Sequence, residues 1–223
     1  GGRLDYVGGR RQLRVSTVVN VIGGDKARGD LVGFPDLSVP TEVHVIGIGG
    51  AGMSAIAEVL ITMGHRISGS DLKATAGLER LRALGVEVYV GHDAAQVGGA
   101  EYVTRSTAIP DSNPECVRAL EEGRPLLSRA QMLGAITRFR RTVAIAGTHG
   151  KTTTASMLAL ALRAADFRPS FVIGGDVNEI GTGAAWDDGE LFVVEADESD
   201  GSFLELTPRL AVVTNVDPDH LEH

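Results

Sequence analysis

Two glycine-rich turns, each placed between an apolar strand and a helical segment, constrain the fold of this chain more than any other feature. The first turn follows the strand-like residues 43–48, and the second follows residues 142–147. Helical spacing of apolar residues begins soon after each turn, over 53–64 and over 151–165. This order is typical of α/β folds, because parallel strands need a helical crossover between them.

The remaining sequence continues this alternation of short apolar strands and helices. Further strands are expected over 65–71, 86–91, 101–106, 125–128, 170–175, 191–197 and 210–217, and further helices over 78–85 and 114–122. The polar residues 137–141 form the best boundary between two units. The sequence therefore predicts an α/β protein in which a Rossmann-like domain (42–139) precedes a phosphate-loop ATPase domain (140–223). Parallel sheets with helices on both faces are expected in both.

Residues 1–41 differ from this pattern. They are rich in glycine, contain one strand-like stretch at 13–22, and remain an extension without an assigned role.

Composition limits the classes of function. The chain has 223 residues, of which 43% are hydrophobic and 22% charged, and its formal net charge is -8. It can bury a core, but a net acidic chain is a poor partner for nucleic-acid phosphates. No apolar run reaches the roughly 18 residues of a membrane-spanning helix, so no membrane insertion is expected. The single cysteine, Cys116, indicates a reducing compartment such as the cytoplasm. The oligomeric state does not follow from the sequence.

The first turn carries a nucleotide-binding pattern. Gly47, Gly49 and Gly52 give G-x-G-x-x-G between strand and helix, and Asp71 ends the next strand. Glycines let the backbone approach a pyrophosphate at the positive end of the helix, and the acid suits a ribose hydroxyl. The pattern predicts a nucleotide diphosphate ligand. NAD and a tight turn without a ligand remain alternatives.

The second turn has the sequence of a phosphate loop, A-G-T-H-G-K-T-T over 146–153. Lys151 is placed to meet the β and γ phosphates, and the Thr152 hydroxyl is placed to hold Mg²⁺. Ile145 stands where the common pattern has its first glycine, so the loop is a shortened form. ATP or GTP is expected to bind the following residues: Gly147, Thr148, His149, Gly150, Lys151, Thr152 and Thr153.

Acidic residues gather over 187–223, next to two apolar strands. Glu195 ends one of these strands, and Asp217 and His220 follow the other. Because parallel strands present their carboxyl ends at one sheet edge, these groups are expected beside the phosphate loop, where oxygen ligands suit Mg²⁺. A solvated acidic face is the alternative, and zinc lacks the usual ligand spacing. Glu195 and His220 are the preferred metal ligands.

Other titratable residues are expected to serve the structure alone. His44 lies inside a strand and is expected in the core, His65 is expected to be exposed, and Cys116 is expected to be a buried apolar residue. His92 follows a strand end, and the sequence leaves a ligand contact and a structural role equally open.

These motifs together resemble the Mur ligase family, most closely its members that join L-alanine to UDP-N-acetylmuramate. The resemblance rests on IGIGGAGMSAIAEVL, GSD, NPE, AGTHGKTTT, VVEADESDGSFL and VVTNVDPDHLEH, which run in the family's order over 42–223. Two departures stand out. Arg105 precedes Ser-Thr-Ala-Ile where Ser-Ser-Ala-Ile is usual, and Gln131 replaces a usual Glu.

The resemblance implies three domains, of which this chain would hold the first, part of the second and none of the third. The first turn would then hold the diphosphate of UDP-N-acetylmuramate rather than NAD. The residues implied in UDP-sugar binding are Gly47, Gly49, Gly50, Gly52, Ser70 and Asp71.

The implied reaction is ATP-dependent amide formation through an acyl phosphate, in peptidoglycan precursor synthesis. Lys151 would stabilise the transferred phosphoryl group, Thr152 and Glu195 would hold one Mg²⁺, and His220 would hold a second. Three alternatives stay open: a recycling ligase that attaches a preformed tripeptide to the same UDP-sugar, an NAD-dependent oxidoreductase, and an inactive nucleotide-binding fragment.

Overall fold

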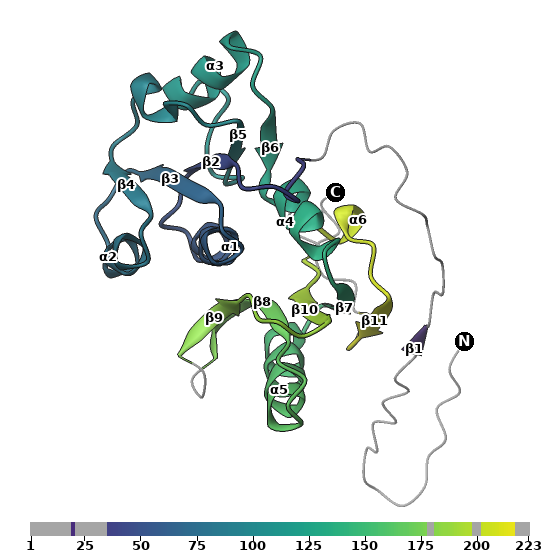
Figure 1. Ribbon diagram of the computed structural model, residues 1–223. Helices are drawn as coiled ribbons and strands as arrows, with labels where there is room; N and C mark the ends of the chain where they lie inside the picture. The colour runs from purple at the N-terminus through teal and green to yellow at the C-terminus, as the bar shows by residue number, and fades with distance from the viewer. Residues whose placement is uncertain (1–18, 21–34, 178–180, 198–201, 217–223) are drawn as a thin grey trace, which may run out of the picture.

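The computed structural model describes residues 19–20, 35–177, 181–197 and 202–216 (Figure 1). Within them the chain forms two sheets whose strands alternate with helices. None of the described helices is long and apolar enough to cross a membrane. The α/β class expected from the sequence is confirmed.

The first sheet has five parallel strands in the order β4-β3-β2-β5-β6. They are β2 (Glu42–Ile46), β3 (Arg66–Asp71), β4 (Glu87–Val90), β5 (Tyr102–Arg105) and β6 (Leu126–Ser128). The accompanying helices are α1 (Ala51–Thr62), α2 (Ala76–Ala83), the 3-10 helix η1 (Ala94–Val97) and α3 (Pro114–Glu121). The strand order changes direction at β2, which makes the end of β2 the switch point where α/β sheets bind ligands.

The second sheet has six strands in the order β1-β11-β7-β10-β8-β9. They are β1 (Val19–Asn20), β7 (Arg141–Ala146), β8 (Ser170–Val177), β9 (Thr182–Ala185), β10 (Leu191–Glu195) and β11 (Leu210–Val213). The central four are parallel, but both edge strands run antiparallel, unlike the purely parallel sheet expected. β9 is antiparallel because the chain returns from β8 by a short hairpin connection.

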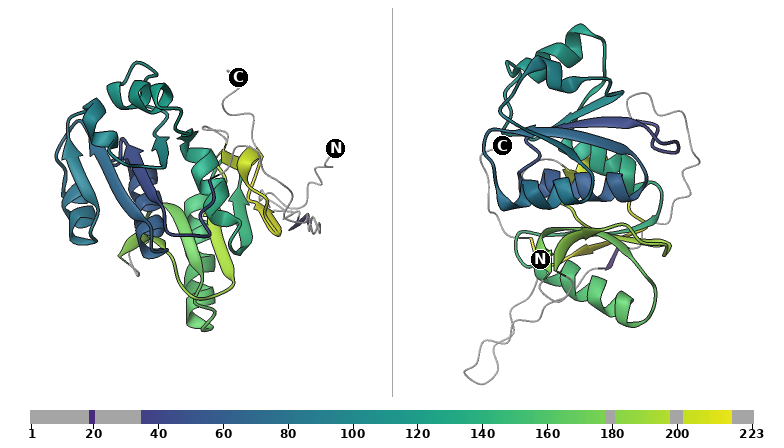
Figure 2. Two further views of the ribbon diagram at one scale, coloured as in Figure 1. Left: turned by 45° about the horizontal axis from the view of Figure 1, so that its top comes forward. Right: turned by 60° about the vertical axis from the view of Figure 1, so that its left-hand side comes forward.

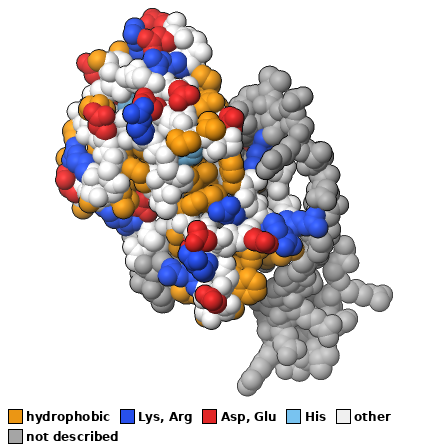
Figure 3. All heavy atoms as spheres, in the orientation of Figure 1, with side chains coloured by type: hydrophobic (Ala, Val, Ile, Leu, Met, Phe, Trp, Pro, Cys, Tyr) orange, Lys and Arg blue, Asp and Glu red, His pale blue; other side chains and the backbone are white. Residues whose placement is uncertain are grey.

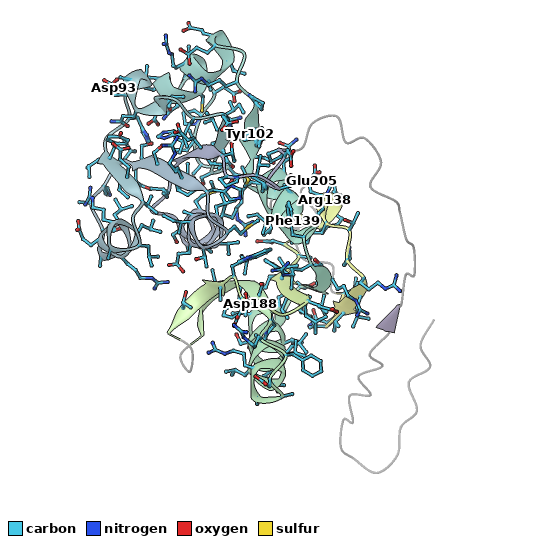
Figure 4. All side chains as sticks on the ribbon, in the orientation of Figure 1. Asp93, Tyr102, Arg138, Phe139, Asp188 and Glu205 are labelled. Atoms are coloured by element: carbon cyan, nitrogen blue, oxygen red, sulfur yellow. The ribbon has the colours of Figure 1, made fainter. Side chains whose placement is uncertain are left out.

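Helices cover this second sheet on both faces. α5 (Lys151–Ala164) packs on β7, β8 and β10, and α1 packs on β8 and β9 from the opposite face (Figures 1 and 2). α4 (Arg129–Thr137) lies beside α1, and α6 (Ser202–Glu205) packs on α4, with Glu205 next to Arg138 (Figure 4). We call the elements β2 to α4 the first unit and β7 to β11 the second unit.

Helix α4 has no counterpart among the helices expected from the sequence. Its start signal is a capping box in which Ser128 accepts a hydrogen bond from the Gln131 backbone while the Gln131 side chain accepts one from the Ser128 backbone. Glutamine and glutamate both complete this motif, so the departure at Gln131 preserves the helix start.

The largest apolar cluster crosses from the first unit into the second. It contains Ile56 and Leu60 of α1, Leu133 of α4, and Val172 and Phe192 of the second sheet. Each of these side chains is at most 3% exposed. Burial of apolar area contributes about 25 cal/mol per Å². The contact between the units is therefore part of the hydrophobic core.

The sequence also predicted whether three residues outside the glycine turns are buried or exposed. His44 and Cys116 are buried as expected, and burial raises the pKa of the Cys116 thiol. His65 was expected to be exposed, and this is wrong. Its backbone N–H returns to the Leu60 carbonyl at the end of α1, which turns the ring inward, where the Thr41 N–H donates to Nδ1 (3.3 Å). Burial lowers the pKa of His65.

Candidate active site

The first glycine turn lies at the carboxyl end of β2, at the switch point of the first sheet. Gly47 has a φ of +78°, and the N–H groups of Gly47 and Ile48 both donate to the Ser70 carbonyl, over 2.8 and 3.0 Å. Gly50 precedes α1 and makes no side-chain cap. The Gly50 N–H in turn donates to the Gly47 carbonyl (3.1 Å), so what the turn can offer a diphosphate is the partial positive charge at the N-terminus of α1.

Asp71 closes this turn from the end of β3. Its Oδ2 accepts a hydrogen bond from the Gly49 N–H (2.9 Å), and its Oδ1 accepts one from the Lys73 N–H (3.3 Å). A Cβ atom at Gly49 would lie 2.8 Å from the same Oδ2, so glycine is needed for this approach. Asp71 shapes the turn in this structure, and its contact with a ribose stays a prediction.

Arg129, the first residue of α4, lies against the same turn and was missed in the sequence. A Cβ atom at Gly52 would lie 2.5 Å from Arg129 Nε, so the guanidinium group reaches the first turn of α1. Guanidinium groups bind phosphates through several N–H donors, and this one stands beside a helix N-terminus. The capping box of α4 is the sequence signal that would have placed Arg129 on a helix start.

A buried carboxylate lies behind the first turn. Glu115 of α3 is fully buried, and its Oε2 accepts from Ser70 Oγ (2.7 Å) and lies 2.8 Å from His92 Nδ1. Its Oε1 lies 3.2 Å from His44 Nε2. These contacts offset the cost of burying a charge. The Ser70 hydroxyl is thus engaged in the interior, while its carbonyl holds the turn, and its role in UDP-sugar binding stays a prediction.

The second glycine turn lies at the carboxyl end of β7 and opens α5. Gly147 has a φ of +127°, and a Cβ atom there would lie 2.2 Å from Thr214 Oγ1. Gly150 is left-handed, with a φ of +81°, and directly precedes Lys151 at the helix start. Lys151 Nζ donates to the Gly147 carbonyl (2.7 Å), so the ammonium group lies over the loop. The loop thus brings an ammonium group to the N-terminus of α5, and both favour an anion.

Asn215, just after β11, pairs with the backbone of this loop. Its Oδ1 accepts from the His149 N–H and its Nδ2 donates to the His149 carbonyl, each over 3.0 Å. The Thr214 hydroxyl donates to the same carbonyl (2.6 Å). The paired residues are 66 positions apart in the sequence, so no local pattern relates them. Asn215 and Thr214 therefore join the site as residues that hold the phosphate loop in shape.

Replacing Asn215 with alanine is expected to weaken ATP binding by up to about 10-fold, because it removes two hydrogen bonds to the exposed backbone of His149, each worth about 0.5–1.5 kcal/mol. Asn215→Asp keeps the acceptor but sets a carboxylate oxygen against the His149 carbonyl and adds a negative charge near the expected triphosphate, so a loss at least as large is expected. Titration with ATP measures the effect, and UDP-N-acetylmuramate is the internal control, since its expected site is on the other sheet. Unchanged ATP affinity in Asn215→Ala would contradict this role.

Glu195 ends β10, directly beside the phosphate loop. It lies opposite Ile145 in the register of β10 and β7. The Ala196 N–H donates to the Ile145 carbonyl (2.9 Å), which carries the pairing one residue further. Glycine at 174 gives the carboxylate room, because a Cβ atom there would lie 2.6 Å from Glu195 Oε2. The carboxylate therefore lies at the edge of the sheet from which the phosphate loop rises.

One oxygen of this carboxylate favours a cation. Within the described residues, Glu195 Oε1 is buried and has no hydrogen-bond partner. A buried carboxylate oxygen without a donor is costly, and Mg²⁺ coordination would satisfy it. The described part of the chain contains no cluster of three His, Cys, Asp or Glu suited to a metal. Mg²⁺ beside phosphates needs only one or two protein carboxylates, so Glu195 fits it, and the role of Thr152 stays a prediction.

Two residues predicted from the sequence, Asp217 and His220, lie outside the described residues. Thr152 and Thr153 are exposed at the start of α5. On the face drawn in Figure 3, acidic and basic side chains lie side by side over both units, so this face is not dominated by one sign.

The sequence matches two models of one protein family. The model described as "Mur ligase family, catalytic domain" matches residues 42–141, and the "Mur ligase middle domain" matches residues 145–223.

Curated relatives agree with these matches. The UDP-N-acetylmuramate--L-alanine ligase of Allorhizobium ampelinum is 56% identical over 181 residues, which cover 81% of this chain and 38% of that protein. The ligase of the same name from Agrobacterium fabrum is 54% identical over the same shares. This chain therefore spans about two fifths of the length of these relatives.

Solved structures resemble the fold. UDP-N-acetylmuramate-alanine ligase from Thermotoga maritima matches with a TM-score of 0.75 at 34% identity, over 82% of this chain and 43% of that one. The UDP-N-acetylmuramate:L-alanyl-gamma-D-glutamyl-meso-diaminopimelate ligase from Neisseria meningitides also has a TM-score of 0.75, at 35% identity, over 82% of this chain and 62% of that one. With both domain models, these relatives and this fold in agreement, the chain belongs to the Mur ligase family.

Proposed function

We propose that this chain supplies the UDP-sugar site and part of the ATP site of a ligase that joins L-alanine to the carboxylate of UDP-N-acetylmuramate. Residues 42–139 would form the UDP-sugar domain and residues 140–223 the incomplete ATP domain. The observation that carries the proposal is the presence of two glycine turns, each between a strand and the start of a helix, on two sheets that share one core, in a chain 54–56% identical to L-alanine ligases.

The proposed chemistry activates a carboxylate, which is itself a poor electrophile. The sugar carboxylate attacks the γ-phosphate of ATP, ADP leaves, and the amine of L-alanine then displaces phosphate from the acyl phosphate. Phosphoryl transfer depends on positioning and on neutralising charge. The loop N–H groups would orient the triphosphate, and Lys151 would leave the Gly147 carbonyl to contact the transferred phosphoryl group.

Thr152, Glu195 and His220 are the proposed Mg²⁺ ligands. Bound Mg²⁺ would neutralise phosphate charge during transfer. The orphaned Glu195 Oε1 supports this role for Glu195. For the UDP-sugar, we propose that Gly47, Gly49, Gly50 and Gly52 contact the diphosphate with help from Arg129, and that Asp71 contacts the ribose. Peptidoglycan precursor synthesis in the cytoplasm, and with it a part in cell shape and division, follows from the proposed reaction.

A second candidate is a ligase that attaches a tripeptide to the same UDP-sugar. The structure of the Neisseria ligase matches this chain with the same TM-score, 0.75, as the L-alanine ligase from Thermotoga maritima, and this supports the second candidate. Amino-acid selection would depend on residues outside the shared part. An NAD-dependent oxidoreductase, the reading that the first turn alone allows, leaves the phosphate loop without a purpose.

Phosphate release decides between these functions. It is measured in a protein that carries these residues together with the C-terminal part present in the relatives, with ATP, UDP-N-acetylmuramate and either L-alanine or the tripeptide. Release with L-alanine is expected. Release with the tripeptide alone would shift the proposal to the second candidate. Calorimetry on the 223-residue chain should show binding of UDP-N-acetylmuramate, and binding of NAD instead would contradict both ligase functions.

A further inference from the structure

α1 lies between the two nucleotide sites. Its first residue, Ala51, follows the first glycine turn, and the helix packs against β8 and β9 of the second unit (Figure 1). A cavity of about 250 Å³ runs along this contact. Ala51, Ser54, Ala55 and Glu58 line it, and their spacing places them on one face of the helix. That face connects the UDP-sugar turn with the surface of the second unit.

Three polar side chains join the units at this cavity. Arg80 of α2 donates from Nη2 to Glu58 Oε1 and to Thr182 Oγ1, the second over 2.8 Å. Thr182 Oγ1 donates to Glu58 Oε2 over 2.9 Å. The Glu58 side chain is 12% exposed and the Arg80 side chain 43%. We call these residues the inter-unit triad, because two of them belong to the first unit and Thr182 belongs to the second.

Thr182 lies near the carboxyl ends of the parallel strands of the second sheet, the same end from which the phosphate loop rises. It pairs with Val177 of β8, three residues beyond Gly174, where β8 passes closest to the Glu195 carboxylate. β8 is in turn paired with β10, the strand that ends at Glu195. The triad is therefore connected to the proposed Mg²⁺ ligand through two strand pairs, β9 with β8 and β8 with β10.

We propose that Glu58, Arg80 and Thr182 are positioning residues that fix the first nucleotide site relative to the second. This inference rests on the proposed function. Apolar contacts hold the two units together without fixing their relative orientation, whereas hydrogen bonds to charged groups require a defined geometry. Reacting groups must come within about 3–3.5 Å, and a misplacement of about 1 Å costs about 100-fold in rate. A partly exposed ion pair adds little to the free energy of unfolding. Loss of the triad should therefore lower the rate of ligation more than it lowers the stability of the fold.

Thr182→Val tests the triad, since it removes the hydroxyl and keeps the side-chain volume. The matched control is Thr62→Val on α1, whose hydroxyl donates to the Glu58 carbonyl of its own helix (2.7 Å) and does not cross between the units. Ligation is measured in the protein that carries the C-terminal part of the relatives. For Thr182→Val, kcat should fall about 10-fold or more while KM for ATP and for the UDP-sugar changes less than about 2-fold. Thr62→Val should keep the parent kcat.

A double-mutant cycle with Glu58→Gln separates positioning from general damage. If the triad acts as one unit, Glu58→Gln combined with Thr182→Val loses no more rate than the more damaging single variant. Additive losses, or a parent-like kcat in Thr182→Val, would overturn the proposal.

Hydrogen exchange on the 223-residue chain tests the contact without any activity. The Ala184 amide is left out of the comparison, because its N–H donates to the Thr182 hydroxyl that the substitution removes (3.2 Å). For the other β9 amides, Thr182→Val should speed exchange and leave α5 unchanged, whereas Thr62→Val should exchange β9 at the parent rate. Absence of ligase activity in the parent would contradict the proposed function. The hydrogen-exchange comparison would still test whether the triad holds the two units together. Parent-like β9 exchange in Thr182→Val would overturn the triad even if the enzyme is active.

Discussion

Replacing Lys151 with alanine is expected to lower ATP turnover by about 100-fold or more, the loss typical of removing one preorganised charge-stabilising donor. The ammonium group stands at the start of α5, over the phosphate loop, where it can follow charge onto the transferred phosphoryl group. Binding of UDP-N-acetylmuramate should stay within about 2-fold of the parent, because its expected turn is on the other sheet. Phosphate release and calorimetry measure the two effects.

Arg163→Ala is the matched control for this variant. Arg163 is an exposed cation near the C-terminus of the same helix, so its removal changes the net charge equally and leaves the loop intact. Normal ATP turnover in Lys151→Ala would contradict the assignment of the loop. An equal loss of UDP-sugar binding would indicate misfolding rather than lost catalysis.

Glu195→Gln should cause a loss of similar size, together with a higher Mg²⁺ requirement. The amide keeps the shape of the side chain but removes the negative charge that favours a cation. It also offers a donor where the carboxylate oxygen has no partner. Turnover is expected to fall about 100-fold at a fixed Mg²⁺ concentration and to recover partly as Mg²⁺ is raised. Titration of turnover against Mg²⁺ measures both features.

Glu190→Gln is the control for the charge itself. Glu190 is exposed and precedes the same strand at its opposite end, away from the loop. It should keep the parent Mg²⁺ dependence. An unchanged Mg²⁺ dependence in Glu195→Gln would remove Glu195 from the proposed metal ligands.

Both glycine turns and the strands other than β9, which was not expected from the sequence, were predictable because their signals are local. Apolar runs, helical spacing and glycine placement each depend on a few adjacent residues, and the observed bounds of β3, α3 and β6 lie within one or two residues of the expected ones. The turns at Gly47 and Gly147 followed from the same local signals.

What the sequence did not predict depends on contacts between distant segments. Asn215 pairs with His149 across two strands, Arg129 reaches Gly52 from another helix, and Thr182 meets Glu58 across the contact between the units. None of these pairs shares a period or a motif. The burial of His65 belongs to the same class, because it depends on how the chain turns after α1.

The hairpin of β8 and β9 has a consequence for self-association. An exposed sheet edge offers unpaired backbone groups to a strand of another molecule, which is a route to aggregation. Here the outer strand on that side is the short β9, and α1 packs against it. A short edge strand is a poor template for strand addition, so the hairpin of β8 and β9 itself protects this edge of the second sheet.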